Sequence, residues 1–232
     1  PLGHFLADNG ENLNKTMDGI YPIVAGAVTE SQRERILAHL KNPQEMFTPV
    51  GISAVDRTAG YYVTNGYWNG NVWLSHQWFV WKTMLDLGET DFAWQIAKTA
   101  LDAWKREVEY SYYTFEMFSI ETGRGGWFHN FGGLSAPVNL WSAAYFKPGT
   151  YQSGFDTFCK TAQFHSDCTA FSGVFRNYGD TESALLLVMQ DNAQYTVLLN
   201  GETAEYKSRF DGMLEIKLPV RGEDLHISVQ LV

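Results

Sequence analysis

Apolar residues recur at helical spacing in the first 150 positions of the chain and predict four helices there. The clearest covers 30–41, where Ile36, Leu37 and Leu40 share one face opposite charged side chains. Thr29 and Gln32 have the spacing of a capping box at its start, and Asn42-Pro43 ends it. The other three expected helices cover about 72–87, 89–110 and 137–146.

Beyond about residue 162 the pattern changes to short alternating segments separated by turns, which is typical of antiparallel strands. Asn200-Gly201 and Asp211-Gly212 are strong signals for hairpin turns between such segments. The expected strands cover 171–176, 183–190, 194–199, 203–210, 213–218 and 225–231.

Together these patterns predict a mainly α chain with a β appendage. Residues 1–150 are expected to form a helical domain, 151–161 a linker, and 162–232 a small antiparallel β-sandwich domain. Residues 1–30 are expected to be irregular, with a turn at 18–22. Two long segments that are rich in glycine and aromatic residues, 43–70 and 121–133, are expected to be loops, and loops of such length are usually functional.

Composition narrows the partners of the chain. The 232 residues carry a net charge of −9, which makes nucleic acid and anionic membrane surfaces poor candidates. We find no apolar run long enough to cross a membrane. Aromatic residues make up 15% of the chain, which suits either a ring-rich core or a cleft in which rings stack on sugars. Neutral molecules therefore remain candidate substrates.

The two cysteines, Cys159 and Cys168, leave the redox compartment open, because a disulfide and two free thiols are equally compatible with their spacing. The start of the chain does not indicate a compartment, and we slightly favour a periplasmic or secreted one. No cofactor is expected. Calcium could bind in the loops, but no EF-hand spacing supports it, and no metal ligands are proposed.

Two segments carry the candidate chemistry. The first is Gly66-Tyr67-Trp68-Asn69-Gly70-Asn71-Val72-Trp73, at the start of the expected helix 72–87. The second begins Glu116-Met117-Phe118-Ser119-Ile120-Glu121-Thr122-Gly123 and continues through Trp127 and His129.

These segments, in this order, resemble two signatures of glycoside hydrolase family 63 and its mannosylglycerate-hydrolase-like relatives. The first resembles Tyr-Trp-Arg-Gly-Pro-Val-Trp, and the second resembles Glu-x-Tyr-x-x-x-Thr-Gly, which carries the catalytic base. The resemblance covers about residues 1–150 and implies the C-terminal portion of an (α/α)6 barrel. It also implies inverting hydrolysis, which needs two carboxyl groups roughly 6.5–9.5 Å apart.

The resemblance assigns Glu116 as the general base and an oligosaccharide or other α-linked glycoside as the substrate. Tyr67, Trp68, Trp73 and Trp127 would form the substrate pocket, and Asn69 would contact sugar hydroxyls. His129 is expected either to contact substrate or to support its loop. Without the motifs, a single Glu in an aromatic loop would more often be a solvated or ion-paired residue.

Three features depart from the family pattern. Asn69 and Asn71 replace Arg and Pro in the first signature, which removes a bidentate donor and would change substrate contacts. Gly133 and Leu134 stand where the family usually has Trp after Phe-Gly, which suggests a change of substrate. No Asp matches the motif of the family's general acid, although Asp8, Asp18 and Asp56 lie near the start of the chain. We therefore expect an upstream part of the same protein, or a partner chain, to complete the barrel. The alternative is a non-catalytic carbohydrate-binding or assembly module.

Overall fold

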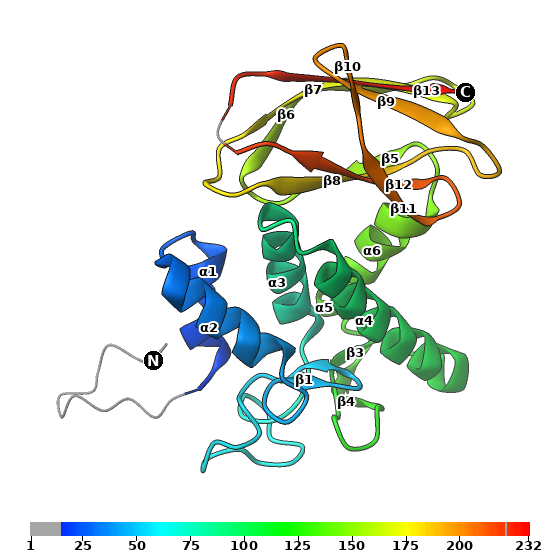
Figure 1. The fold of residues 1–232 in the computed structure, drawn as a ribbon. Helices are drawn as coiled ribbons and strands as arrows, with labels where there is room; N and C mark the ends of the chain where they lie inside the picture. The colour runs from blue at the N-terminus through cyan, green and yellow to red at the C-terminus, as the bar shows by residue number, and fades with distance from the viewer. Residues whose placement is uncertain (1–14, 221) are drawn as a thin grey trace. The chain divides into compact units, whose positions relative to one another are not determined.

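The computed structural model describes residues 15–220 and 222–232, so the expectations for residues 1–14, Asp8 included, lie outside it. The chain divides into two compact units. One contains the described residues up to Trp81 together with Trp94–Val138, and the other contains Lys82–Ala93 together with Asn139–Val232. Figure 1 shows the helices and strands of both units. The domain limits that we expected at 150 and 162 stay a prediction.

The fold class that we predicted is wrong. Of the described residues, 32% are helical and 31% are in strands, so the chain is mixed α/β and not a mainly α chain with a β appendage. The extra strands come from segments that we expected to be loops or linker. Two hairpins form within 43–70 and 115–129, and two strands begin at Thr150 and Thr157. Gly and aromatic residues made the hairpin segments look irregular, although their backbones pair.

The helices at 30–41 and 137–146 have the limits that we expected, and those near 72–87 and 89–110 begin and end within two residues of them. Thr29 and Gln32 form the predicted capping box, in which the Gln32 side chain accepts from the Thr29 backbone N–H at 2.8 Å. The helices are α1 (Met17–Val24), α2 (Glu30–Lys41), α3 (Leu74–Asp86), α4 (Thr90–Ser111), α5 (Gly132–Ser135) and α6 (Pro137–Phe146). None that the structure describes is both long and apolar enough to cross a bilayer.

Helix α1 replaces the turn that we expected at 18–22. Its side chains Met17, Ile20 and Ile23 are buried on one face, with Pro22 inside the helix. Burial of three large apolar side chains outweighs both the turn tendency of Asp18-Gly19 and the hydrogen bond that Pro22 cannot donate.

Two hairpins belong to the first unit. Strand β1 (Phe47–Thr48) pairs with β2 (Gly51–Ile52), and β3 (Phe115–Phe118) pairs with β4 (Gly125–His129), both antiparallel. A set of backbone bridges connects distant segments. Val72 and Phe118 exchange both N–H···O bonds at 2.9 Å, and Val72 also bridges Ser53. These bridges bring the two sequence motifs side by side.

The turn between β3 and β4 is fixed by a buried ion pair. Glu107 on α4 is 1% exposed, and its carboxylate accepts from Arg124 Nε at 2.7 Å, Arg124 Nη2 at 3.0 Å and the Gly125 backbone N–H at 2.8 Å. The Arg124 guanidinium lies 3.8 Å from the centre of the Tyr110 ring. Hydrogen bonding to Arg124 lowers the pKa of Glu107 to about 2. The pair therefore anchors the hairpin that carries Glu116 to α4.

The second unit contains two antiparallel sheets, which Figure 1 labels strand by strand. One has the order β10-β9-β13-β7-β6 and the other the order β11-β12-β8-β5. Their buried side chains form a single apolar cluster that includes Phe175, Leu187 and Ile227. The strands are β5 (Thr150–Gln152), β6 (Thr157–Phe164), β7 (Ala170–Asn177), β8 (Ser183–Val188), β9 (Tyr195–Leu199), β10 (Glu202–Ala204), β11 (Tyr206–Phe210), β12 (Met213–Leu218) and β13 (Leu225–Leu231).

The turn signals predicted two hairpins of this unit. Asn200-Gly201 joins β9 to β10 and Asp211-Gly212 joins β11 to β12, with positive φ at Asn200, Gly201 and Gly212. The expected single strand 203–210 is two strands, β10 and β11, which belong to different sheets. Cys159 and Cys168 are both free thiols in this structure.

Replacing Glu107 by Gln should lower the free energy of unfolding at pH 7 by about 1.5–3 kcal/mol, the range for hydrogen bonds to charged groups. Because the folded-state pKa of about 2 lies below the ordinary value of 4.5, the unfolded state binds more protons between these values. The stabilisation by Glu107 is therefore complete above pH 4.5 and lost as pH falls toward 2. Urea denaturation from pH 2.5 to 7 measures both effects.

Glu109→Gln is the matched control, because Glu109 lies on the same helix and its ion pair with Lys105 is exposed at 3.7 Å. It should change stability by less than about 0.5 kcal/mol. Equal losses for Glu107→Gln and Glu109→Gln would contradict a special role for the buried pair.

Candidate active site

The two sequence motifs meet at a hydrogen bond between Tyr67 and Glu116. Tyr67 lies in the loop before α3, and Glu116 is the second residue of β3. The Tyr67 hydroxyl donates to Glu116 Oε1 at 2.5 Å, although the two residues are 49 positions apart in the sequence. The structure thus brings the proposed base and the first signature together.

The Glu116 carboxylate is nearly closed off from solvent, at 5% exposure. Its second oxygen, Oε2, is buried and has no hydrogen-bond partner among residues 15–220 and 222–232. No lysine, arginine or histidine in that part of the chain forms an ion pair with it. A buried carboxylate oxygen without a donor is costly in a protein interior, and its presence calls for a bound water, a ligand or a functional role.

The same contact acts on the tyrosine. The hydrogen bond to Glu116 raises the pKa of the Tyr67 hydroxyl above its ordinary value of 10.0, and desolvation and the negative charge of Glu116 act in the same direction. The hydroxyl is therefore a neutral donor over the whole neutral pH range.

Three tryptophans surround the Tyr67 ring. Its centre lies 4.9 Å from those of Trp73 and Trp127 and 5.1 Å from that of Trp68, each at a steep angle. Trp68 stacks on Trp73 at 4.4 Å with nearly parallel planes, and Trp73 Nε1 donates to the Tyr67 carbonyl at 3.0 Å. We call Tyr67, Trp68, Trp73 and Trp127 the aromatic cluster.

The cluster is buried at one side and open at the other. Trp73 is 3% exposed and packs with Ala54 and Met117 in a small core. Trp68 and Trp127 are 62% and 61% exposed. Exposed indole faces held in place by a buried partner can stack on the apolar face of a sugar ring, or on any other flat apolar ligand.

A β-bulge lies opposite Glu116. Phe115 pairs with His129 and Met117 pairs with Gly126, so Trp127 and Phe128 together face the single residue Glu116. Trp127 has a φ of 64°, a left-handed conformation that is strained for a bulky side chain. Bulges and strained residues of this kind are concentrated next to active sites, where they redirect a side chain.

Asn69 and His129 do not reach the Glu116 carboxylate through any contact that the structure describes. Asn69 Nδ2 donates to the Tyr61 carbonyl at 2.9 Å, so this amide stabilises the loop in which both residues lie. The exposed His129 ring lies 5.0 Å from that of Tyr113. The roles of all seven predicted site residues stay predictions, but Glu116 and the aromatic cluster lie together.

Sequence reasoning missed two polar residues that support this arrangement. Gln77 on α3 is buried, and its amide both donates to and accepts from the Ile52 backbone at 2.8 Å, which holds β2 against the helix. Asn71 is buried beside Met117, with Nδ2 3.3 Å from its sulfur. A glutamine within an otherwise apolar helix stripe was the available signal for Gln77; nothing in the sequence distinguished Asn71 except its departure from the family motif.

Several other acidic and histidine side chains near the motifs or the start of the chain are occupied or exposed. Glu121, which follows Glu116 in the second motif, is exposed and accepts from Asn65 Nδ2 at 3.4 Å. Asp18 is exposed on α1. His76 is hydrogen-bonded to the Tyr21 hydroxyl at 2.5 Å, and burial lowers its pKa to about 4, so the ring is neutral at pH 7.

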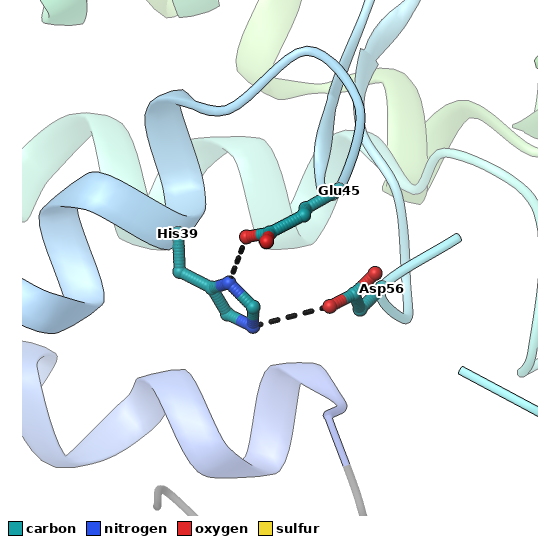
Figure 2. A group of neighbouring side chains, drawn as sticks. All are labelled: His39, Glu45 and Asp56. Atoms are coloured by element: carbon teal, nitrogen blue, oxygen red, sulfur yellow. Dashed lines mark hydrogen bonds and ion pairs between the residues drawn. The ribbon is translucent and has the colours of Figure 1, made fainter. Parts of the chain in front are cut away.

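Asp56 belongs to a separate ionic group, which Figure 2 shows together with His39 and Glu45. The His39 ring lies between the two carboxylates, with Nδ1 bonded to Glu45 and Nε2 3.3 Å from Asp56. Lys15 contacts the same Asp56 oxygen at 3.0 Å. Hydrogen bonds from Thr58 and Lys15 lower the pKa of Asp56 despite its burial. These atoms are close enough to hold a metal ion, but an ion there would compete with Lys15 and the imidazole contacts.

The left-handed backbone at Trp127 predicts an unusual order of stability. Trp127→Gly should be more stable than Trp127→Ala by about 1 kcal/mol, because only Gly adopts this φ without strain and both variants lack the ring. At Phe128, which is similarly exposed but has an ordinary φ, Ala should be the more stable replacement. Thermal unfolding of the four variants checks this, and the same order at both positions would contradict the geometry.

A solved structure with a similar fold is an uncharacterised conserved protein from Thermus thermophilus, with a TM-score of 0.50 and 23% identity over 58% of this chain. A mannosylglycerate hydrolase of family 63 from the same organism, in complex with glucose, has a TM-score of 0.48 and 24% identity over 56% of this chain. This chain covers only 33% and 31% of those two proteins.

The family model described as the mannosylglycerate hydrolase MGH1-like glycoside hydrolase domain matches residues 5–141. The match includes both sequence motifs, Glu116 and the aromatic cluster, and it confirms the resemblance that the motifs predicted. The chain therefore belongs to the family of mannosylglycerate hydrolase MGH1-like glycoside hydrolase domains.

Proposed function

We propose that this chain is part of an inverting glycoside hydrolase acting on α-linked glycosides or oligosaccharides, and that Glu116 is its general base. In such a reaction the base takes a proton from water as the water attacks the anomeric carbon, and an acid protonates the departing oxygen. Membership in a glycoside hydrolase family supports the class of reaction. The stereochemistry and the linkage are part of the proposal.

The buried Oε2 atom of Glu116 is the observation that carries the assignment. One carboxylate oxygen accepts from Tyr67, and the other has no donor in the described chain. A donor from outside this set of residues would relieve the cost of that buried oxygen, and the attacking water is such a donor.

The general acid is proposed to come from an upstream part of the same protein or from a partner chain. This chain spans about a third of the length of the solved proteins that it resembles. Within the described residues, Asp56 has a lowered pKa and is engaged by Lys15 and His39, which makes it a poor proton donor. A second carboxyl group at roughly 6.5–9.5 Å from Glu116 is what the mechanism requires.

The tryptophans of the aromatic cluster are proposed to hold the sugar. Trp68 and Trp127 offer exposed ring faces, and the bulge and the Trp73 stack fix their positions relative to Glu116. An aromatic wall beside a carboxylate suits a neutral pyranose, whose carbon faces are apolar and whose edges carry hydroxyls. The net charge of −9 gives no general attraction for an anionic substrate.

Glu116→Gln should lower hydrolysis of α-linked glycosides by about 10²–10⁴-fold in the full-length protein that carries this chain, because the amide cannot accept the proton of water. The stability of the variant should stay close to that of the wild type, since the amide oxygen still accepts from Tyr67. Glu121→Gln is the matched control and should retain activity, because Glu121 is exposed. Full activity in Glu116→Gln would rule out Glu116 as the base.

Trp68→Ala should weaken binding of oligosaccharides by about tenfold, which corresponds to about 1.4 kcal/mol, because the exposed face of the aromatic cluster is removed. Calorimetric titration measures this. Tyr112→Ala, at an 85% exposed residue outside the cluster, should leave the affinity unchanged. If the wild-type full-length protein binds oligosaccharides but hydrolyses none, the chain is a carbohydrate-binding module and the hydrolase proposal fails.

A further inference from the structure

We propose that Tyr67 is a positioning residue for Glu116 and not, as its place in the motif suggested, a contact for the sugar. The inference rests on the proposed function. Its hydroxyl holds Oε1 of the carboxylate, so that Oε2 alone is left to accept the proton of the attacking water.

The polar contact of the Tyr67 hydroxyl supports this role. It donates to Glu116 at 2.5 Å, a length typical of a hydroxyl bonded to a carboxylate. A phenol has a single proton to donate, so this bond leaves none for a sugar hydroxyl. A sugar could then reach Tyr67 only as a hydrogen-bond donor.

The surroundings of Tyr67 prevent the ring from turning away. The Trp73 ring packs against it, and Trp73 Nε1 donates a hydrogen bond to the Tyr67 carbonyl. The ring centres of Trp68 and Trp127 lie 5.1 and 4.9 Å from that of Tyr67. The loop closes tightly behind it: a Cβ atom at Gly70 would lie 2.2 Å from the Val63 carbonyl oxygen. The ring is therefore fixed before substrate binds, as preorganised active sites require.

The backbone at Glu116 is fixed by the residues that follow it in β3. Its neighbours Met117 and Phe118 are fully buried, and Phe118 is paired to Val72 through two backbone hydrogen bonds. The side chain has rotational freedom about its own bonds only, and the bond to Tyr67 selects one orientation. Without that bond, the carboxylate could rotate and present either oxygen to water.

Loss of the Tyr67 hydroxyl should affect kcat and KM differently. Loss of a group that orients a base should lower kcat and leave KM nearly unchanged, because the ground-state sugar contacts remain.

Tyr67→Phe removes the hydroxyl and keeps the ring. In the full-length protein, assayed with an α-linked glycoside, we expect kcat to fall by about 10–100-fold, as for other groups that orient an active-site ligand. KM should stay within about twofold. Tyr61→Phe, which removes a hydroxyl elsewhere in the same loop, should change none of these quantities.

The reciprocal variant tests the contact independently of activity. Glu116→Gln should lower the pKa of Tyr67 toward 10.0, measured by ultraviolet titration. An unchanged Tyr67 pKa in Glu116→Gln would overturn the proposal, and so would a raised KM with unchanged kcat in Tyr67→Phe, which would make Tyr67 a substrate contact. If the wild type hydrolyses no glycoside while the pKa of Tyr67 falls in Glu116→Gln, the contact exists but the proposed function, and with it the catalytic role of Tyr67, is wrong.

Discussion

The candidate site depends on the pairing of Val72 with Phe118 through two backbone hydrogen bonds. This bridge joins the first motif to strand β3 and sets the register between them. In an extended segment, a slip of one residue turns every side chain to the opposite face, so Glu116 would point away from Tyr67. The buried Glu107–Arg124 pair and the burial of Met117 hold the same register from the other side. The aromatic cluster and the hydrogen bond at Glu116 both follow from this geometry.

The sequence was most informative where structure is local. The capping box at Thr29 and the hairpin turns at Asn200 and Asp211 depend on residues a few positions apart, and each forms as predicted. The motifs also identified the residues that meet at the site, Glu116 and the aromatic cluster. That prediction came from the family resemblance, since composition alone suits an aromatic core as well as a sugar cleft.

The parts that sequence reasoning missed involve pairing between distant segments. The β3–β4 hairpin is irregular in composition. Its bulge at Trp127 needs a left-handed backbone conformation, and a tryptophan in the sequence does not predict one. The Asn69 amide donates to a carbonyl of its own loop, at Tyr61, a contact that the sequence did not predict, and its expected contact with a sugar stays a prediction. The mixed α/β class was missed for the same reason, because short strands gain their stability from partners that the local pattern does not show.

The long separation between Tyr67 and Glu116 has a consequence for how the chain folds. The 49 positions between them include all of α3 and α4, so the loop between the motifs must close before the site exists. Helices form early because their contacts are local, and their formation shortens the effective length of that loop. The hairpin carrying Glu116 should therefore join the folded chain late. Substitutions at the Val72–Phe118 bridge would then accelerate unfolding more than they slow folding.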